Sequence, residues 1–235
     1  MSNIKQHLNQ VLDQIRAAEE KYQRPRGSVK LLAVSKTWPL ESILEAVATG
    51  QHCFGENYVQ ESVAKIDSCT ENLEWHFIGH LQSNKSREIA TRFDWVHSVE
   101  RLKLAKRLSE QRPTDLVPLN ICLQVNIDNQ PSKSGFVASE IPEFAEQISQ
   151  LPNLKLRGLM AIPAPSDNFE RQRAAFHQVA TMQQQLVEQG LGLDTLSMGM
   201  SGDMEAAIAE GATIVRVGTA IFGPRHYPGL IGRNN

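Results

Sequence analysis

The sequence has few cysteines, and they are scattered. Cys53, Cys69 and Cys122 are the only three in 235 residues, and none belongs to a CxxC pair or a Cys/His cluster. Disulfide frameworks and zinc sites need several suitably spaced ligands, so we expect neither. Cys53 and Cys122 are interpreted as small core residues.

Long apolar runs are also missing, as is an excess of one charge. No stretch approaches the roughly 20 apolar residues of a membrane span, and residues 1–7 lack the apolar block of a signal peptide. The formal net charge is -2, so the composition gives no electrostatic sign of a nucleic-acid partner. We therefore expect a cytoplasmic protein that binds neither a membrane nor nucleic acid.

What the sequence does contain is a regular alternation of short apolar runs and helical patterns. An amphipathic helix comes first, and eight candidate strands follow at 30–35, 51–54, 75–79, 94–98, 119–127, 155–161, 194–198 and 213–217. Helical patterns lie near 40–49, 57–67, 83–92, 100–111, 138–150, 168–189 and 202–210. No low-complexity linker divides the chain. This pattern favours an α/β fold, a single (β/α)8 barrel domain over 1–235 with an extra N-terminal helix. An open doubly wound sheet is the alternative.

Lys36 follows the first candidate strand directly, at a position where barrel enzymes place their working groups. Lysine is depleted from strands, and it is almost never fully buried without a partner. An amine at this position is therefore either a solvated edge residue or a reactive group that desolvation has prepared for Schiff-base chemistry. Position alone leaves both interpretations open.

The loops after the last two strands have the composition of a phosphate site. Such sites in barrels are typically built after strands seven and eight, at a helix N-terminus. Ser201 is expected to cap a helix beginning near Gly202, and Gly218 and Thr219 can add backbone N–H groups. An ordinary cap and turn is the alternative. The charge of Asp203 would repel a phosphate if it pointed inward.

Arg216 lies within the apolar run of the last strand. A guanidinium there is costly unless paired, so it either forms a buried ion pair with a strand-end carboxylate or donates to a ligand. A reactive lysine and a phosphate cup together suit a ligand that has both an aldehyde and a phosphate. Pyridoxal phosphate (PLP) is such a ligand.

The motifs that carry these residues resemble the pyridoxal phosphate homeostasis family, and they cover almost the whole chain in order. They are AVSKT at 33–37, FGENYVQE at 54–61, WHFIGHLQSNK at 75–85, GLM at 158–160, LSMGMS at 196–201 and VRVGTAIFG at 215–223. The resemblance implies a fold-type-III barrel similar to the N-terminal domain of alanine racemase. It also implies PLP bound as a Schiff base on Lys36.

The same resemblance implies roles for six further residues. Arg216 would face the pyridine nitrogen, Asn57 would line the ring pocket, and the phosphate would be held by Ser201, Gly202, Gly218 and Thr219. An arginine can only donate to the ring nitrogen, which would leave that nitrogen unprotonated and weaken the cofactor as an electron sink.

Two positions depart from the family pattern. Gln130 stands where the family usually has an acidic residue, and Gly202 stands where a larger polar residue is common. Both departures bear on local loop structure. Lys133 is a second amine near the expected barrel mouth, and it is either a solvated loop residue or a group that helps handle the phosphate.

Three functions are consistent with the sequence. The first is a non-catalytic protein of PLP (vitamin B6) homeostasis, which buffers PLP or delivers it to PLP-dependent apo-enzymes. The second is an amino-acid racemase or another PLP enzyme, and the third is a Schiff-base aldolase that uses Lys36 without a cofactor.

The racemase alternative lacks an evident second catalytic base. Alanine racemase uses a further β-rich domain to supply a tyrosine across a dimer, whereas only Tyr227 follows the last strand here. We therefore expect a monomer. His76, His80 and His97 lie near strand ends, where each is either an acid–base group or a histidine satisfied by packing.

Overall fold

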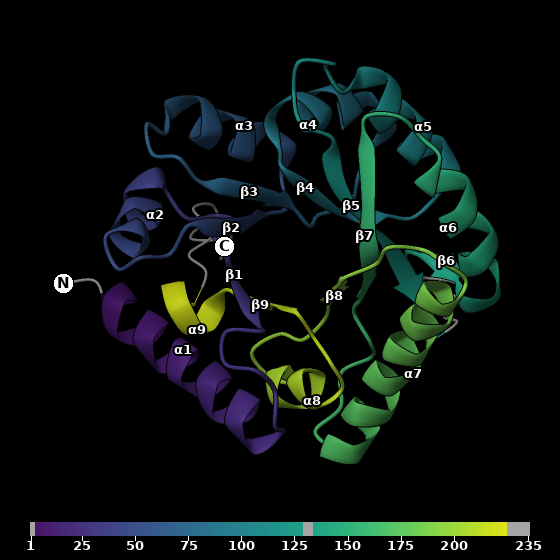
Figure 1. The fold of residues 1–235 in the computed structure, drawn as a ribbon. Helices are drawn as coiled ribbons and strands as arrows, with labels where there is room; N and C mark the ends of the chain where they lie inside the picture. Colours follow the sequence, from purple (N-terminus) through teal and green to yellow (C-terminus); the bar gives the residue numbers. More distant parts are fainter. Residues whose placement is uncertain (1–2, 129–133, 225–235) are drawn as a thin grey trace, which may run out of the picture.

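The structure is a computed structural model that describes residues 3–128 and 134–224. Eight parallel strands close into a barrel, because β1 pairs with both β2 and β9 while β4 pairs with β5 (Figure 1). The barrel strands are β1 (Lys30–Val34), β2 (Cys53–Glu56), β3 (Glu74–Phe77), β4 (Trp95–Val99), β5 (Leu119–Asn126), β7 (Leu154–Ala161), β8 (Thr195–Ser197) and β9 (Ile214–Val217). Closure confirms the predicted barrel and excludes the open sheet.

Helices form an outer ring around the strands (Figure 1). They are α2 (Leu40–Val47), α3 (Val59–Ser68), α4 (Ser86–Arg92), α5 (Leu102–Gln111), α6 (Ile141–Ser149), α7 (Phe169–Glu188), α8 (Met204–Ala209) and α9 (Thr219–Phe222), with 3-10 turns η1 (Ser83–Lys85) and η2 (Ala138–Glu140). None of these helices, nor the N-terminal one, combines the length and the apolar character that crossing a bilayer requires.

The N-terminal helix α1 (Ile4–Lys21) takes the place in the ring that a full-length last helix would fill. Helix α9 has only four residues, and α1 packs against it as well as against α8 and α2. Its buried face consists mainly of apolar residues at helical spacing, among them Ile4, Leu8, Val11 and Ile15. The extra helix therefore completes the covering of the barrel.

The second strand was predicted at 51–54, but it runs from Cys53 to Glu56. Gln51 lies before the strand, where its side-chain amide donates to the carbonyls of Leu31 and Cys53. Glu56 ends the strand fully buried, which an apolar pattern does not predict. The two-residue strand β6 (Phe136–Val137) and helix α9 were also not predicted, because elements this short carry almost no periodic signal.

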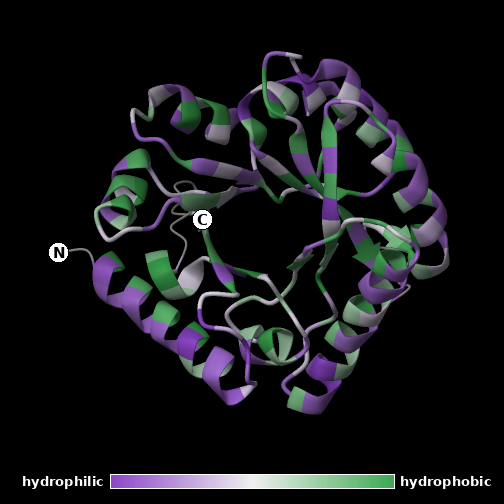
Figure 2. Ribbon diagram, viewed as in Figure 1, coloured by the Kyte–Doolittle hydropathy of each residue, from purple (hydrophilic) through white to green (hydrophobic). Residues whose placement is uncertain are grey.

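Hydrophobic side chains form two layers. The larger cluster fills the space between the strands and the helices, and it includes most of the buried apolar residues. A separate small cluster, Trp95, Cys122 and Met160, lies on the other face of the sheet, inside the barrel. Hydrophilic and hydrophobic residues alternate along the outer helices (Figure 2). The rest of the barrel interior is unusually polar, with His76, His97, Ser197 and Arg216 buried in it. The candidate site adjoins these residues.

Candidate functional site at the C-terminal end of the barrel

Lys36 lies in a tight turn just beyond β1. The Trp38 N–H donates to the Ser35 carbonyl at 3.1 Å, which closes a four-residue turn with Lys36 at its second position. Thr37, the third residue, has φ 68°, the value that a type II turn requires and that a β-branched residue rarely adopts. Strained residues of this kind persist only where their surroundings hold them.

A buried ionic cluster beside α3 holds this turn on both sides of Lys36. The Lys65 ammonium donates to the Ser35 carbonyl (2.9 Å), to Glu56 Oε1 (2.7 Å) and to Glu61 Oε1 (2.5 Å). Glu61 Oε1 also accepts the Thr37 N–H at 2.6 Å, and Glu56 accepts the Ser35 hydroxyl at 2.7 Å. The backbone before and after Lys36 is therefore fixed through one lysine.

Burial sets the electrostatics of that cluster. Glu56 is fully buried, and this burial raises the pKa of its carboxyl group, while the Lys65 ammonium and the Ser35 hydroxyl oppose the rise. Within the part of the chain that the structure describes, the second carboxylate oxygen of Glu56 has no hydrogen-bond partner. Removing Lys65 would leave this carboxylate unpaired in an apolar layer, which is a severe cost.

Lys36 shares a small cavity with two of the residues predicted to hold phosphate. Gly218 and Thr219 line this cavity together with Val34 and Trp38. Gly218 is the N-cap of α9, and a Cβ atom there would come within 3.1 Å of the Val34 carbonyl oxygen. Glycine therefore lets the first turn of α9 lie directly against the end of β1.

Arg216 lies in the barrel interior one strand away from Lys36, with 4% of its surface exposed. Its Nη1 donates to the Ser197 carbonyl (2.6 Å) and hydroxyl (2.7 Å), and its Nη2 donates to the Ala161 carbonyl (2.9 Å). Burial lowers the pKa of this guanidinium to about 10, and Asp203 opposes the change. The expected alternative of an ion pair with a strand-end carboxylate is not formed within the described part of the chain. Three of its five N–H groups are used, so two can serve a ligand.

Asn57 lies just after β2, beside a different cavity of the barrel rim. Tyr58, His80 and Lys85 also line that cavity. The Asn57 side-chain carbonyl is buried, and neither it nor the Thr37 hydroxyl has a hydrogen-bond partner among the described residues. A Cβ atom at Gly79 would collide with the Asn57 backbone, so the loop after β3 presses against this asparagine.

Ser201 does not cap α8 as predicted. The helix begins two residues later than expected, and its N-cap is Asp203, without a side-chain capping bond. The Asp203 carboxylate instead accepts the Met200 N–H at 2.6 Å, which turns the charge back onto its own loop. Ser201 and Gly202 are exposed and line an outer hollow with residues of α1 and α7, not the cavity of Lys36.

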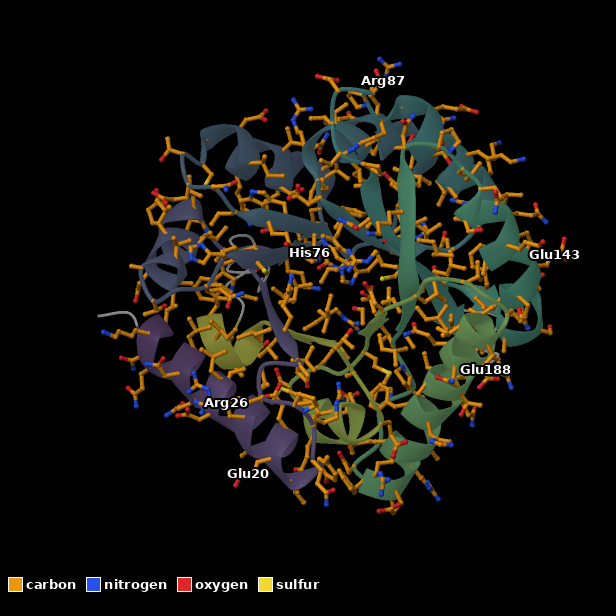
Figure 3. The ribbon with its side chains drawn as sticks, viewed as in Figure 1. Glu20, Arg26, His76, Arg87, Glu143 and Glu188 are labelled. Carbon is orange, nitrogen blue, oxygen red and sulfur yellow. The ribbon has the colours of Figure 1, made fainter. Side chains whose placement is uncertain are left out.

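The three histidines singled out from the sequence have different environments. His76 and His97 are fully buried in the barrel interior, and His76 lies near the centre of the barrel in Figure 3. Burial lowers the pKa of both, so both are neutral near pH 7. His80 is mostly exposed at the rim, with its Nδ1 3.6 Å from Glu100 Oε1.

Cys53, Glu74 and His76 bring ligand-type atoms within 4.8 Å of one another at the N-terminal end of the barrel. The Lys30 ammonium is 3.1 Å from the same Glu74 oxygen that contacts His76, so it already supplies positive charge there. Burial raises the pKa of the Cys53 thiol to about 11, and the charge of Glu74 adds to the rise. The group is therefore an ionic cluster with a protonated thiol.

Sequence reasoning missed the residues that support the site. Glu56, Glu61 and Lys65 received no role, although Glu61 and Lys65 form an i,i+4 pair on the predicted helix. Ser197, which orients Arg216, looked like an ordinary strand residue. Lys133 and Gln130 lie outside the described residues.

Similarity to known proteins agrees with this geometry. Residues 6–226 match the alanine racemase N-terminal domain family. The pyridoxal phosphate homeostasis protein of Vibrio alginolyticus is 54% identical over 232 residues, covering 97% of this chain and 100% of the relative. The protein of the same name from Escherichia coli K12 is 52% identical, covering 97% and 99%. The chain belongs to the pyridoxal phosphate homeostasis protein family.

Solved structures extend the comparison. PipY of Synechococcus elongatus, solved with PLP bound, is 42% identical with a TM-score of 0.79, over 88% of this chain and 98% of PipY. Alanine racemase of Corynebacterium glutamicum is only 18% identical, with a TM-score of 0.67 over 95% of this chain and 63% of the racemase. That second likeness shows the shared fold alone.

Proposed function

We propose that this chain binds PLP reversibly as a Schiff base on Lys36 and serves intracellular PLP homeostasis. The observation that carries the proposal is the cavity that joins Lys36 to Gly218 and Thr219, with Arg216 in the adjacent strand. PLP has an aldehyde that can react with the Lys36 amine and a phosphate that can accept hydrogen bonds from the backbone N–H groups near Gly218 and Thr219. The names of the relatives and the PLP-bound PipY structure support the same assignment.

The residues present fit this cofactor. The side-chain oxygens of Thr37 and Asn57, which have no partner within residues 3–128 and 134–224, are buried polar atoms of the kind that a ligand satisfies. Thr219 begins a helix turn, where the first N–H groups have no partner within the helix and favour an anion. Arg216 offers two further donors, which we assign to the ring nitrogen. Ser201 and Gly202 stay candidates for the phosphate only if their loop moves toward Lys36.

Buffering and delivery of PLP fit the structure better than catalysis does. Racemisation requires acid–base groups on both faces of the substrate carbon. His76 and His97 are buried and engaged with other side chains, so they are not free to exchange protons with a substrate. We propose a cytoplasmic monomer whose single barrel domain spans 1–235 and whose partners are PLP and PLP-dependent apo-enzymes.

The first test is borohydride reduction of the PLP-treated protein, followed by peptide mapping. We expect a pyridoxyl group on Lys36, none in Lys36→Arg, and no loss in the control Lys103→Arg, since Lys103 is exposed on α5. A colourless protein that takes up no PLP would contradict the proposal and favour the cofactor-free aldolase.

Two further experiments separate carrier from enzyme. Amino acids incubated with the loaded protein in heavy water should show no exchange of the α-proton by NMR, and steady exchange would favour the racemase. In the second, the loaded protein activates a PLP-dependent apo-enzyme while a scavenger removes free PLP. Activation that rises with apo-enzyme concentration under the scavenger indicates direct delivery. If the scavenger abolishes activation, the protein releases PLP into solution and acts only as a buffer.

A further inference from the structure

A continuous chain of hydrogen bonds crosses the barrel interior and ends on Arg216. Glu74 Oε1 lies 2.6 Å from His76 Nε2, His76 Nδ1 lies 2.8 Å from His97 Nε2, and His97 Nδ1 lies 2.7 Å from the Ser197 hydroxyl. The same hydroxyl accepts Arg216 Nη1 at 2.7 Å. Strands β3, β4, β8 and β9 each contribute at least one member. The three middle members are fully buried.

Donor and acceptor chemistry fixes the direction of every bond in this chain. Arg216 can only donate, so the Ser197 oxygen accepts, and its hydrogen points to the other partner, His97 Nδ1. His97 then carries its hydrogen on Nε2 and donates to His76 Nδ1. His76 in turn donates from Nε2 to the Glu74 carboxylate. All four bonds therefore point from the cation to the anion, and both histidines are neutral.

The opposite orientation does not satisfy the same atoms. If His97 donated from Nδ1 to Ser197, the serine hydrogen would lose its acceptor. Neutral His76 would donate from Nδ1 and turn a lone pair toward the Glu74 carboxylate, 2.6 Å away. Buried polar groups pay a full desolvation cost for such mismatches. The neutral chain consequently has one favourable arrangement.

Charged groups at both ends favour that arrangement. The hydrogen bond with His76 lowers the pKa of the Glu74 carboxyl group to about 2, and Lys30, 3.1 Å away, adds to the shift. The other groups that act on the chain are Asp94 and Cys53 near Glu74 and His76, and Asp203 and Cys122 near Arg216. Trp95 stacks on His76 with ring centroids 5.3 Å apart and shields the middle of the chain.

We propose that Ser197, His97, His76 and Glu74 are positioning residues for Arg216. They hold its Nη1 edge, so that the two N–H groups left over point to the cofactor, and they connect the guanidinium to a carboxylate at the opposite end of the barrel. The proposal rests on PLP binding as proposed above. It assigns a role in cofactor binding to residues that make no contact with the cavity of Lys36.

The first test uses the protein without PLP and is independent of the proposed function. Long-range 1H–15N NMR of the histidine rings reports which nitrogen carries the proton, and His76→Gln and His97→Gln assign the two signals. We expect the Nε2–H tautomer for both histidines at pH 7. A proton on Nδ1 of His97 would overturn the direction of the chain.

The second test asks whether the chain acts on bound PLP. Ser197→Ala removes the hydroxyl that Arg216 and His97 share and leaves the Ser197 backbone carbonyl bonded to Arg216. We expect PLP binding to weaken by about tenfold, because a buried charge-assisted bond is lost. Glu74→Gln keeps an acceptor for His76 but removes the distant charge. It should shift the pH midpoint of the bound cofactor's absorbance to lower pH, since lost negative charge disfavours protonation.

Asp194→Asn is the matched control for Glu74→Gln. Asp194 also lies at the N-terminal end of a strand and pairs with an arginine, Arg157, but it does not belong to the hydrogen-bond chain that ends on Arg216. This variant should keep the wild-type affinity and pH midpoint. If Ser197→Ala and Glu74→Gln also keep the wild-type PLP affinity and pH midpoint while retaining the Lys36 adduct, the positioning role is wrong. If the wild-type protein forms no adduct, the proposed function fails, and the NMR result still decides the hydrogen-bond chain.

Discussion

His97 and Ser197, one hundred residues apart in the sequence, meet in the barrel interior through a hydrogen bond of 2.7 Å. His97 belongs to β4 and Ser197 to β8, so the bond spans the barrel from one side to the other. Apolar side chains usually fill this space in (β/α)8 barrels. Here a hydrogen-bonded polar group occupies it, which makes stability sensitive to the protonation of buried groups.

Stability should fall as the solution becomes acidic. The pKa values of His76 and His97 are lowered by burial, so below the unfolded pKa near 6.5 the unfolded chain binds protons that the folded chain does not. The free energy of unfolding is therefore highest above that pH, and the two histidines reduce it progressively as the pH falls below about 6.5. Two such groups give a slope approaching about 2.7 kcal/mol per pH unit. Urea unfolding between pH 5 and 7.5 measures it.

The single variant His97→Gln is the control for this slope. It removes one of the two groups, so the slope of stability against pH should drop by about half. An unchanged slope would show that other groups are responsible for the loss of stability in acid.

Lys65→Met should destabilise the fold by about 3–5 kcal/mol, because it leaves the buried Glu56 carboxylate unpaired. The double variant Lys65→Met with Glu56→Gln should regain part of this loss, because no buried charge remains. Lys21→Met breaks an exposed pair with Glu205 and should change little. Urea titration of the three variants gives the comparison. Equal effects at Lys65 and Lys21 would rule out the ionic cluster as a structural support.

Gly79→Ala should destabilise the protein by about 1–3 kcal/mol and weaken PLP binding, because its new methyl group would collide with the Asn57 backbone. Gly192→Ala is the matched control, since a Cβ there meets no atom within 4 Å. That control should be neutral or slightly stabilising. Thermal unfolding and PLP titration measure both effects, and a neutral Gly79→Ala would place the loop farther from Asn57.

Cys122, which is buried in the core, and Cys53, which is only half-buried, should both resist alkylation in the folded protein. Burial raises the pKa of Cys53 to about 11 and that of Cys122 to about 12, so the thiolate, which is the reactive form, is scarce at pH 8. For Cys53 the scarcity alone slows the reaction by a factor on the order of a hundred relative to a free thiol. Mass spectrometry after timed alkylation of folded and urea-unfolded protein measures this. If Cys122 reacted at the same rate in the folded and the urea-unfolded protein, its burial would be contradicted.

Much of the fold was accessible from the sequence because local patterns carry it. Parallel strands buried on both faces appear as short apolar runs, and the covering helices show an amphipathic period. The strand boundaries were less accurate where a charged residue such as Glu56 continues a strand. That charge is tolerated only because Lys65 lies beside it in space, which no local pattern reveals.

The sequence by itself determined the barrel, its N-terminal helix and the position of Lys36 at a strand end, since these follow from periodicity and chain order. Tertiary structure decided which polar residues act together. It placed Gly218 and Thr219 beside Lys36, turned Asp203 onto its own loop, and joined Glu74 to Arg216 through three buried side chains. The physical reason is that barrel closure brings distant strands together, and hydrogen bonds depend on distances in space.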